Sequence, residues 1–295
     1  MKLRLLGLIL TLALFGLFSC NQIDTNVPKT NSGTGSVVIS LTDAPFPYDM
    51  VEEANITIDW VKLHRVDSLV NQLGNKNENG NGLKASDSVF VMMEKDTTLN
   101  LLDLSNGITA VLSEMDIPAG TYNELRLHVT EASVKVVDDT TMYRLKIPSG
   151  EASGIKVKIR PWLVVEDGVE SEVLLDFDVN RSFKIIGNTH GKKGIKGFMF
   201  KPIVRAINLS TAGKVEGMVT NGDGDKVKNA MITLYTDTDT IASSKSTVGG
   251  YYAIIGVPEG TYSMSCERDG YVTEVVDNVD VQIGNVTTQD FVLTK

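Results

Sequence analysis

Residues 173–179 read VLLDFDV, with apolar side chains at positions 173, 175, 177 and 179 and acids at 176 and 178. Successive side chains of a β-strand point to opposite faces, so this alternation is typical of a strand with one buried face. Similar alternation recurs along the chain, for example in VVISL at residues 37–41 and ITIDW at residues 56–60. Within ITIDW, Trp60 shares a predicted face with Ile56 and Ile58, so we expect its indole to be buried. The pattern predicts an all-β protein.

One segment departs from this alternation. Apolar side chains at positions 108, 111, 112 and 115 have the i, i+3, i+4, i+7 spacing of a helix face, and Ser105 and Asn106 before them can cap a helix. We therefore expect one short helix near residues 106–115 and little helix elsewhere.

The strand pattern and the length predict two β-sandwich-like domains in tandem. The apolar run Phe198–Leu209 is expected to be the last strand of a first domain, residues 36–209, and Ser210–Gly213 precedes a new series of strands. The second domain, residues 213–295, is predicted to be a seven-stranded sandwich with its variable chemistry on end loops. Its strands are expected at residues 215–219, 230–235, 241–247, 251–255, 261–267, 273–281 and 288–293.

Four motifs of the second domain carry a family resemblance: GMVT at 217–220, AMITL at 230–234, GYYAI at 250–254 and VPEGTY at 257–262. Together they resemble the carboxypeptidase regulatory-like domain. The resemblance implies a transthyretin-like sandwich, often grouped with carbohydrate-binding-like folds and found as an accessory in secreted proteins, without peptidase activity. The family commonly has an aspartate before Gly-Tyr-Tyr. This chain has Thr247–Gly250 there, so no role of that aspartate carries over.

The first domain also resembles a family. Its motifs are LTDAP at 41–45, DLSNG at 103–107, IPAGTY at 117–122, IPSGE at 147–151, LDFD at 175–178 and KPIVR at 201–205. In this order they resemble the DUF4382 domain of Bacteroidetes-type lipoproteins, over residues 35–209. That family has no established activity, and the resemblance implies an exported, β-rich domain.

The sequence Pro-x-Gly-Thr-Tyr occurs in both domains, at residues 118–122 and 258–262. The repeat raises the question of a duplication. After Tyr122 the apolar residues fall on the opposite predicted face, whereas Met264 and Cys266 share the face of Tyr262, unless a bulge intervenes. We therefore favour shared turn chemistry, in which Pro fixes φ and Gly relieves strain.

The N-terminus has the three parts of a secretory signal: the cations Lys2 and Arg4, an apolar core from Leu5 to Phe18, and a small residue before a cut. Residues 17–20 read LFSC, which resembles the lipobox of bacterial lipoproteins and implies acylation of Cys20 by fatty acids such as palmitate. The alternative, a transmembrane helix, needs about 20 apolar residues, and this core is shorter. We expect a signal peptide at residues 1–19 and a flexible tether at 20–35.

This anchor predicts a bacterial cell envelope protein, lipid-anchored in the outer membrane. Its face of the envelope, periplasmic or surface-exposed, is left open because Asn21–Asp24 carries one acid. Without Lys2 and Arg4, 26 basic residues remain against 37 acids, a net charge of −11. This acidity argues against a nucleic-acid partner. With Cys20 acylated, Cys266 is the one remaining thiol, and the alternation around it predicts a buried side chain.

Motifs that would indicate catalysis are missing from the sequence: it contains no Gly-x-Ser-x-Gly, no His-Glu-x-x-His, no phosphate-binding loop and no cysteine pair. Of the three histidines, His128 shares a strand face with Glu124 and Arg126, typical of an exposed polar face. Asp176 and Asp178 are interpreted as the polar face of a half-buried strand. The loop Asn221–Asp225 resembles the start of a calcium loop but has Lys226 where glycine is needed, so a hairpin turn is expected. We predict no enzyme activity, no cofactor and no metal.

Two features suggest a ligand. The stretch Arg181–Lys201 concentrates basic residues, including Lys192, Lys193 and Lys196, which could meet acidic glycans or lipid headgroups. Trp162 follows Pro161 near a predicted strand end and could stack on a sugar. The insertion Asn71–Ser86 is expected to be mobile.

We interpret the chain as a non-catalytic, membrane-anchored module that binds or displays something, with carbohydrate as the expected ligand and an envelope protein as the other candidate partner. The alternatives are a structural component of a pilus-like surface complex, which an unpaired edge strand would favour, and an enzyme of unrecognised type.

Overall fold

A computed structural model describes residues 33–44, 51–66, 89–138, 140–147, 153–187 and 195–295. Strands dominate these residues, and none of the helices found in them is long and apolar enough to cross a membrane. The all-β prediction is confirmed. Cys20, the predicted signal peptide and the insertion Asn71–Ser86 lie outside the described residues. The strands from β1 to β11 are called the first domain, and those from β12 to β19 the second domain.

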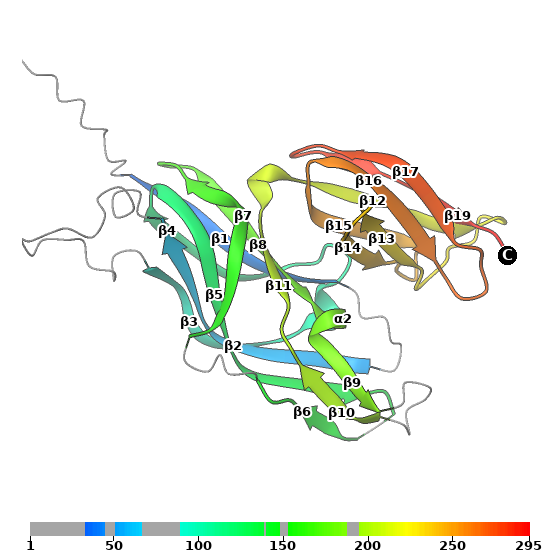
Figure 1. Ribbon diagram of the computed structural model, residues 1–295, viewed down its shortest axis with the longest axis horizontal. Coiled ribbons are helices and arrows are strands. Elements are labelled where there is room, and N and C mark those ends of the chain that lie inside the picture. Colours follow the sequence, from blue (N-terminus) through cyan, green and yellow to red (C-terminus); the bar gives the residue numbers. More distant parts are fainter. Residues whose placement is uncertain (1–32, 45–50, 67–88, 139, 148–152, 188–194) are drawn as a thin grey trace, which may run out of the picture. The chain divides into compact units, whose positions relative to one another are not determined.

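The first domain is built on one sheet of nine strands, in the order β3-β2-β5-β7-β11-β8-β1-β4, with β6 paired to β5 (Figure 1). Its strands are β1 (Thr34–Ala44), β2 (Val51–Arg65), β3 (Val89–Asn100), β4 (Ala110–Pro118), β5 (Gly120–Val136), β6 (Met142–Arg144), β7 (Ile155–Val165), β8 (Glu170–Asp178) and β11 (Val204–Asn208).

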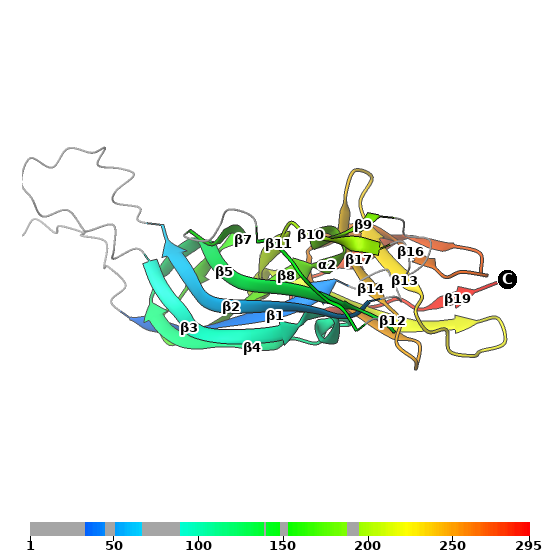
Figure 2. The same cartoon turned by 90° about the horizontal axis from the view of Figure 1, so that it is seen from below.

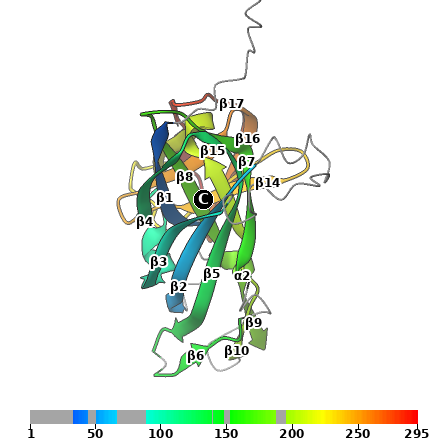
Figure 3. The ribbon, with the colours of Figure 1, turned by 90° about the vertical axis from the view of Figure 1, so that its left-hand side faces the viewer.

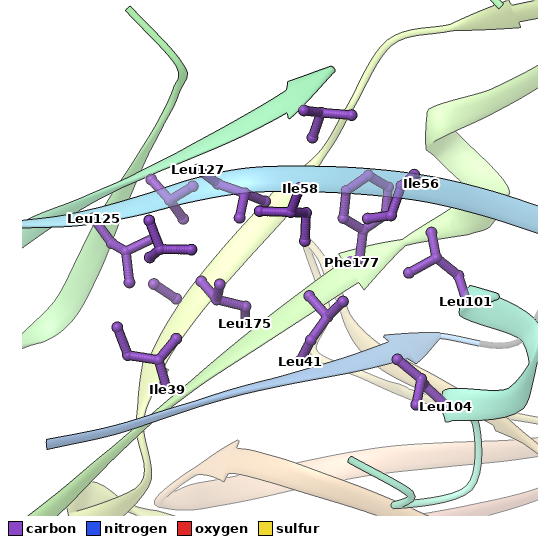
Figure 4. Close-up of a cluster of buried hydrophobic side chains, with 14 of the residues drawn as sticks. Ile39, Leu41, Ile56, Ile58, Leu101, Leu104, Leu125, Leu127, Leu175 and Phe177 are labelled. Atoms are coloured by element: carbon purple, nitrogen blue, oxygen red, sulfur yellow. The ribbon is translucent and has the colours of Figure 1, made fainter. Parts of the chain in front are cut away.

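This sheet folds over so that its two ends meet. The edge strands β3 and β4 run side by side (Figures 2 and 3), and the Ser113 hydroxyl on β4 donates a hydrogen bond to the Met92 carbonyl on β3. The apolar face lies inside: β1, β2, β5 and β8 direct leucine, isoleucine and phenylalanine side chains into one cluster (Figure 4). Because the edges meet, the backbone groups of β3 and β4 are less open to pairing with another chain.

A small hairpin of β9 (Phe183–Gly187) and β10 (Ile195–Phe200) follows the short helix α2 (Val179–Ser182). The run Phe198–Leu209, predicted as one strand, is two: β10 ends at Phe200 and β11 begins at Val204. Pro202 lies in the interruption, where it can donate no ladder hydrogen bond.

The helix predicted near residues 106–115 is wrong. Residues 101–104 form a 3-10 helix, η2, and residues 110–118 form strand β4. Asn106 and Gly107 both have positive φ, 59° and 78°, which makes a turn and prevents a right-handed helix from starting there. Pairing with β1 then holds the segment extended, with Val111 63% exposed.

The second domain is a sandwich of two sheets, β15-β12 with β18 and β19 beside β12, and β14-β13-β16-β17. Its strands are β12 (Ala212–Asn221), β13 (Met231–Tyr235), β14 (Thr240–Lys245), β15 (Tyr251–Pro258), β16 (Gly260–Glu267), β17 (Glu274–Val281), β18 (Val286–Thr288) and β19 (Phe291–Leu293). These match the seven predicted strands, with the last divided in two. Cys266 is fully buried between the sheets, as predicted, and burial raises the pKa of its thiol to about 12.

The two domains share their strand connections. β1 is antiparallel to β4 and parallel to β8, and β12 is antiparallel to β15 and parallel to β18 and β19. β5 lies antiparallel between β2 and β7, as β16 does between β13 and β17. β3 pairs with β2 in the first domain, and β14 pairs with β13 in the corresponding place in the second. The first domain is thus a larger version of the second, with β6, β9, β10 and β11 added.

The Pro-x-Gly-Thr-Tyr motif occupies the same place in both domains, between β4 and β5 and between β15 and β16. The Tyr122 hydroxyl donates to the Pro118 carbonyl and the Tyr262 hydroxyl to the Pro258 carbonyl, each at 2.7 Å. In β5 a bulge after Tyr122 shifts the apolar side by one residue, so the ring shares the core side with Leu125. In β16 no such bulge follows Tyr262, and the ring shares the core side with Met264 by plain alternation. The register difference read from the sequence is thus one extra residue in β5, and the repeat is one of structure as well as turn chemistry.

Candidate ligand-binding face

A row of cations crosses the outer face of β2, β5 and β7, which lie side by side (Figure 1). Lys62 on β2 is opposite Arg126 on β5, and Arg126 is opposite Lys156 on β7. Neighbouring strands are about 4.8 Å apart, so the three strand positions span about 10 Å. Lys158 and Arg160 continue along β7 on the same side. With Trp162, these residues are called the basic face.

Strand β7 presents this face because its side chains alternate as far as Arg160 and again from Trp162, with the exposed Pro161 interrupting the alternation. Val157, Ile159, Leu163 and Val165 are buried on one side, and positions 156, 158, 160, 162 and 164 are exposed on the other. Trp162, predicted as a ligand-binding residue, belongs to the exposed set and is 54% exposed. Its carbonyl accepts a hydrogen bond from the Asn208 side chain, which ties its backbone to the end of β11. The indole is therefore available to a ligand.

Glu124 lies between the cations and is buried although it is on the outer side of β5. Its carboxylate accepts hydrogen bonds from Arg126 Nε at 2.9 Å and Lys158 Nζ at 2.6 Å. Burial raises the pKa of Glu124, but these two hydrogen bonds outweigh it and lower the pKa to about 2. Glu124 thus stays ionised and holds the two cations in place.

The two histidines near the basic face differ in their surroundings. Burial, and then the Arg126 charge, lowers the pKa of His64, so its ring is neutral at pH 7. His128 lies on the face of Glu124 and Arg126, as predicted, but its side chain is only 12% exposed and so is not the exposed one expected. Its Nδ1 lies 2.5 Å from the Asp59 carboxylate. Five cations against the Glu124 carboxylate leave the basic face positive on a chain of net charge −9.

Trp60 is not in the core, contrary to the prediction. A bulge between Ile58 and Trp60 turns the indole to the outer side of β2. There it stacks on His128, with ring centroids 4.9 Å apart, and Lys62 Nζ lies 4.2 Å from its centroid. Trp60 therefore supports its neighbours and is itself largely covered.

The other predicted ligand residues are not brought to this face. Lys196 is exposed on β10, in the separate two-stranded sheet, whereas Trp162 is on β7. Lys192 and Lys193 lie outside the described residues. The described part of the Arg181–Lys201 stretch forms the β9–β10 hairpin, but the structure does not join it to Trp162 in one site.

The acidic candidates have structural partners. Asp176 is buried and paired with Arg205, which differs from the exposed polar face expected, and desolvation raises its pKa. The Asp178 side chain accepts from the Arg181 N–H and caps α2. Asn221 accepts from the N–H groups of Asp223 and Asp225, which makes the predicted turn. Within the described residues, no group of three or more His, Cys, Asp or Glu side chains could hold a metal ion.

Sequence reasoning missed most of the basic face. Residues 156–160 read KVKIR, in which cations alternate with apolar residues, and this pattern predicts a basic strand face. That Lys62 and Arg126 lie beside this strand depends on pairing between strands distant in sequence, and the local pattern does not reveal such pairing.

Comparisons with known proteins identify both domains. The model of the domain of unknown function DUF4382 matches residues 34–202, and that of the carboxypeptidase regulatory-like domain matches residues 214–294. The latter describes a regulatory-like domain and not a peptidase. No curated protein matches the chain.

Among solved structures, a "putative carbohydrate binding protein" from Bacteroides uniformis is 17% identical, with a TM-score of 0.24, over 27% of this chain and 40% of that one. The chain thus spans less than half of that protein. The shaft pilin of Lactobacillus rhamnosus GG is 9% identical, with a TM-score of 0.26, over 88% of this chain and 97% of that one. TM-scores this low support no conclusion about the ligand or partners of this chain.

The family models match the two domains in the order that the motifs indicated, and the first covers more than half of the chain. The chain therefore belongs to the DUF4382 family and carries a carboxypeptidase regulatory-like domain after its DUF4382 domain.

Proposed function

We propose that the protein is a non-catalytic envelope lipoprotein that binds an acidic glycan on the basic face of its first domain. The observation that supports this is the line of Lys62, Arg126 and Lys156, which Lys158 and Arg160 continue along β7 toward the exposed Trp162. Cations attract the carboxylates or sulfates of such a polymer, and an indole can stack on a sugar ring. Arg126 and Lys158 are held by ion pairs with Glu124, so we propose for this face a binding role and no catalytic one.

The shape of the site favours an extended polymer over a small anion. A strand face is an open surface, whereas a small anion is bound best where several donors converge in a concavity. Each exposed ion pair contributes only about 0.2–1 kcal/mol, so useful affinity needs several contacts along one ligand. A linear acidic glycan supplies carboxylates at successive units and can meet the cations together.

Binding of the purified full-length chain to an array of acidic and neutral polysaccharides tests this proposal. We expect retention of acidic polysaccharides such as polygalacturonate, weakening as NaCl rises from 0.05 to about 0.5 M, because salt screens exposed charges. If no acidic polysaccharide is retained, or if binding to it is insensitive to salt, the proposal is wrong.

We further propose that Cys20 is acylated after removal of residues 1–19 and anchors the protein in the outer membrane. Two or more acyl chains give stable attachment, since each buried methylene contributes about 0.8 kcal/mol. The variant Cys20→Ser should move from the membrane fraction to the soluble fraction. A variant that remains with the membranes would contradict the lipid anchor. Protease treatment of intact cells then tells which face of the envelope the domains occupy.

A further inference from the structure

The second domain has a polar hollow that the basic face does not involve. Its volume is about 550 Å³, and it lies at one end of the sheet β14-β13-β16-β17. Ligand pockets are typically about 300–1,000 Å³. The hollow is lined by Asn229, Met231, Lys245, Glu267, Arg268, Asp269, Gly270, Tyr271 and Thr273.

The floor of the hollow is set by strand register. Met231 on β13 is paired with Lys245 on β14 and with Glu267 on β16, so the three side chains form a row on the outer side of the sheet. Their neighbours Ile232 and Cys266 point into the core and are fully buried. A thioether flanked by an ammonium and a carboxylate thus gives an apolar strip between a donor and an acceptor.

The wall of the hollow is a tight turn. The Tyr271 N–H donates to the Arg268 carbonyl at 3.0 Å, and Gly270 supplies the positive φ, 83°, that the turn needs. Arg268 Nη1 donates to the Asn229 carbonyl at 3.2 Å, which fixes the guanidinium beside the hollow. The turn therefore presents Arg268, Asp269 and Tyr271 in a defined arrangement.

Tyr271 also lines a second hollow. This one has a volume of about 230 Å³ and is lined by Asn221, Gly222, Asp223, Tyr271, Leu293, Thr294 and Lys295. The Tyr271 ring packs partly on the core, and Lys295 Nζ lies 5.8 Å from its centroid. The ring is thus a half-buried wall shared by two adjoining hollows.

We propose that these hollows bind a neutral oligosaccharide, with Tyr271 between two successive sugar units. The larger hollow carries two cations, Lys245 and Arg268, and two acids, Glu267 and Asp269, so it has no net charge to attract an ion. Sugar hydroxyls donate to carboxylates and accept from ammonium and guanidinium groups. The apolar faces of a sugar ring pack on an aromatic ring such as Tyr271. The inference does not depend on the basic face.

Calorimetric titration of the full-length chain with maltohexaose, cellohexaose and mannohexaose tests the site. At least one should bind, Tyr271→Ala should weaken its binding about tenfold or more, and Asp269→Asn about threefold. Tyr235→Ala, which alters a half-buried tyrosine of β13 outside the hollows, is the matched control and should bind as the parent does.

Thermal unfolding of each variant shows whether it folds, and if Tyr271→Ala does not, the exposed Asp269→Asn carries the test. Lys156→Glu on the basic face should leave neutral-sugar binding unchanged, which separates this site from the proposed acidic-glycan function. The inference is overturned if none of the three sugars binds, or if Asp269→Asn binds as tightly as the parent.

Discussion

Tyr122 and Tyr262 make the same hydrogen bond in two different cores. Each hydroxyl donates to the carbonyl of the proline four residues earlier, at the turn from β4 to β5 or from β15 to β16. Tyr122→Phe and Tyr262→Phe each remove this bond and leave a carbonyl without its donor, which costs roughly 1 kcal/mol. Calorimetric unfolding should show a loss of stability in both variants. Unchanged stability in both would contradict the role given to the motif, and Tyr235→Phe is the control.

Glu124 predicts a pH dependence of stability. Its folded pKa, about 2, lies below the usual value of 4.5, so its contribution is present above pH 4.5 and is lost as the pH falls toward 2. We expect roughly 1–2 kcal/mol, less than the full shift would give, because Lys158 is half exposed and solvent screens its charge. In Glu124→Gln the loss over this pH range should be smaller. Urea unfolding at each pH measures this loss of stability. An equal loss in the parent and in Glu124→Gln would show that groups other than Glu124 cause it.

At the scale of elements, Gly217 allows strand β12 to lie close to Gln289, in the link between β18 and β19. A Cβ at this position of β12 would lie 1.9 Å from the Gln289 carbonyl oxygen, a backbone atom that also accepts from the Tyr252 hydroxyl. Gly217→Ala should therefore destabilise the domain by about 3 kcal/mol, the upper end of overpacking effects.

Gly222→Ala is the matched control, because nothing lies within 4 Å of the added carbon there. It should change stability by less than about 0.5 kcal/mol. Similar melting temperatures for Gly217→Ala and Gly222→Ala would contradict the role given to Gly217, because they would show that β12 and residue 289 can move apart without loss of stability.

The local sequence pattern predicted correctly whether a segment is a helix or a strand, except where pairing between distant strands determined the outcome. The alternation in VLLDFDV predicts β8, and the turn signals of the second domain predict its strands to within a few residues. Residues 106–115 have helical spacing, yet pairing with β1 makes residues 110–118 a strand. The bulge at Trp60 is likewise a property of pairing, because only the partner strands define which residue is extra.

At the scale of the whole molecule, the sequence identified both families and named Trp162 as a candidate ligand-binding residue, but it did not reveal the surface around it. The cations of the basic face come from residues 62, 126 and 156–160, and they meet only because β5 pairs with both β2 and β7. Conversely, the basic stretch Arg181–Lys201 is prominent in the sequence, while its described part lies on the separate β9–β10 hairpin. The same long-range pairings produce the shared strand order of the two domains.

The most direct test of the proposed function compares the affinity of the full-length chain and its variants for polygalacturonate at low salt. Lys156→Glu reverses an exposed charge where the row of cations from β2 and β5 reaches β7, and Trp162→Ala removes the indole. Each should weaken binding about tenfold, which corresponds to about 1.4 kcal/mol. Lys228→Glu, the same reversal at an exposed lysine of the second domain, should change affinity much less. If Lys156→Glu and Trp162→Ala both bind as the parent does, the basic face is not the glycan site.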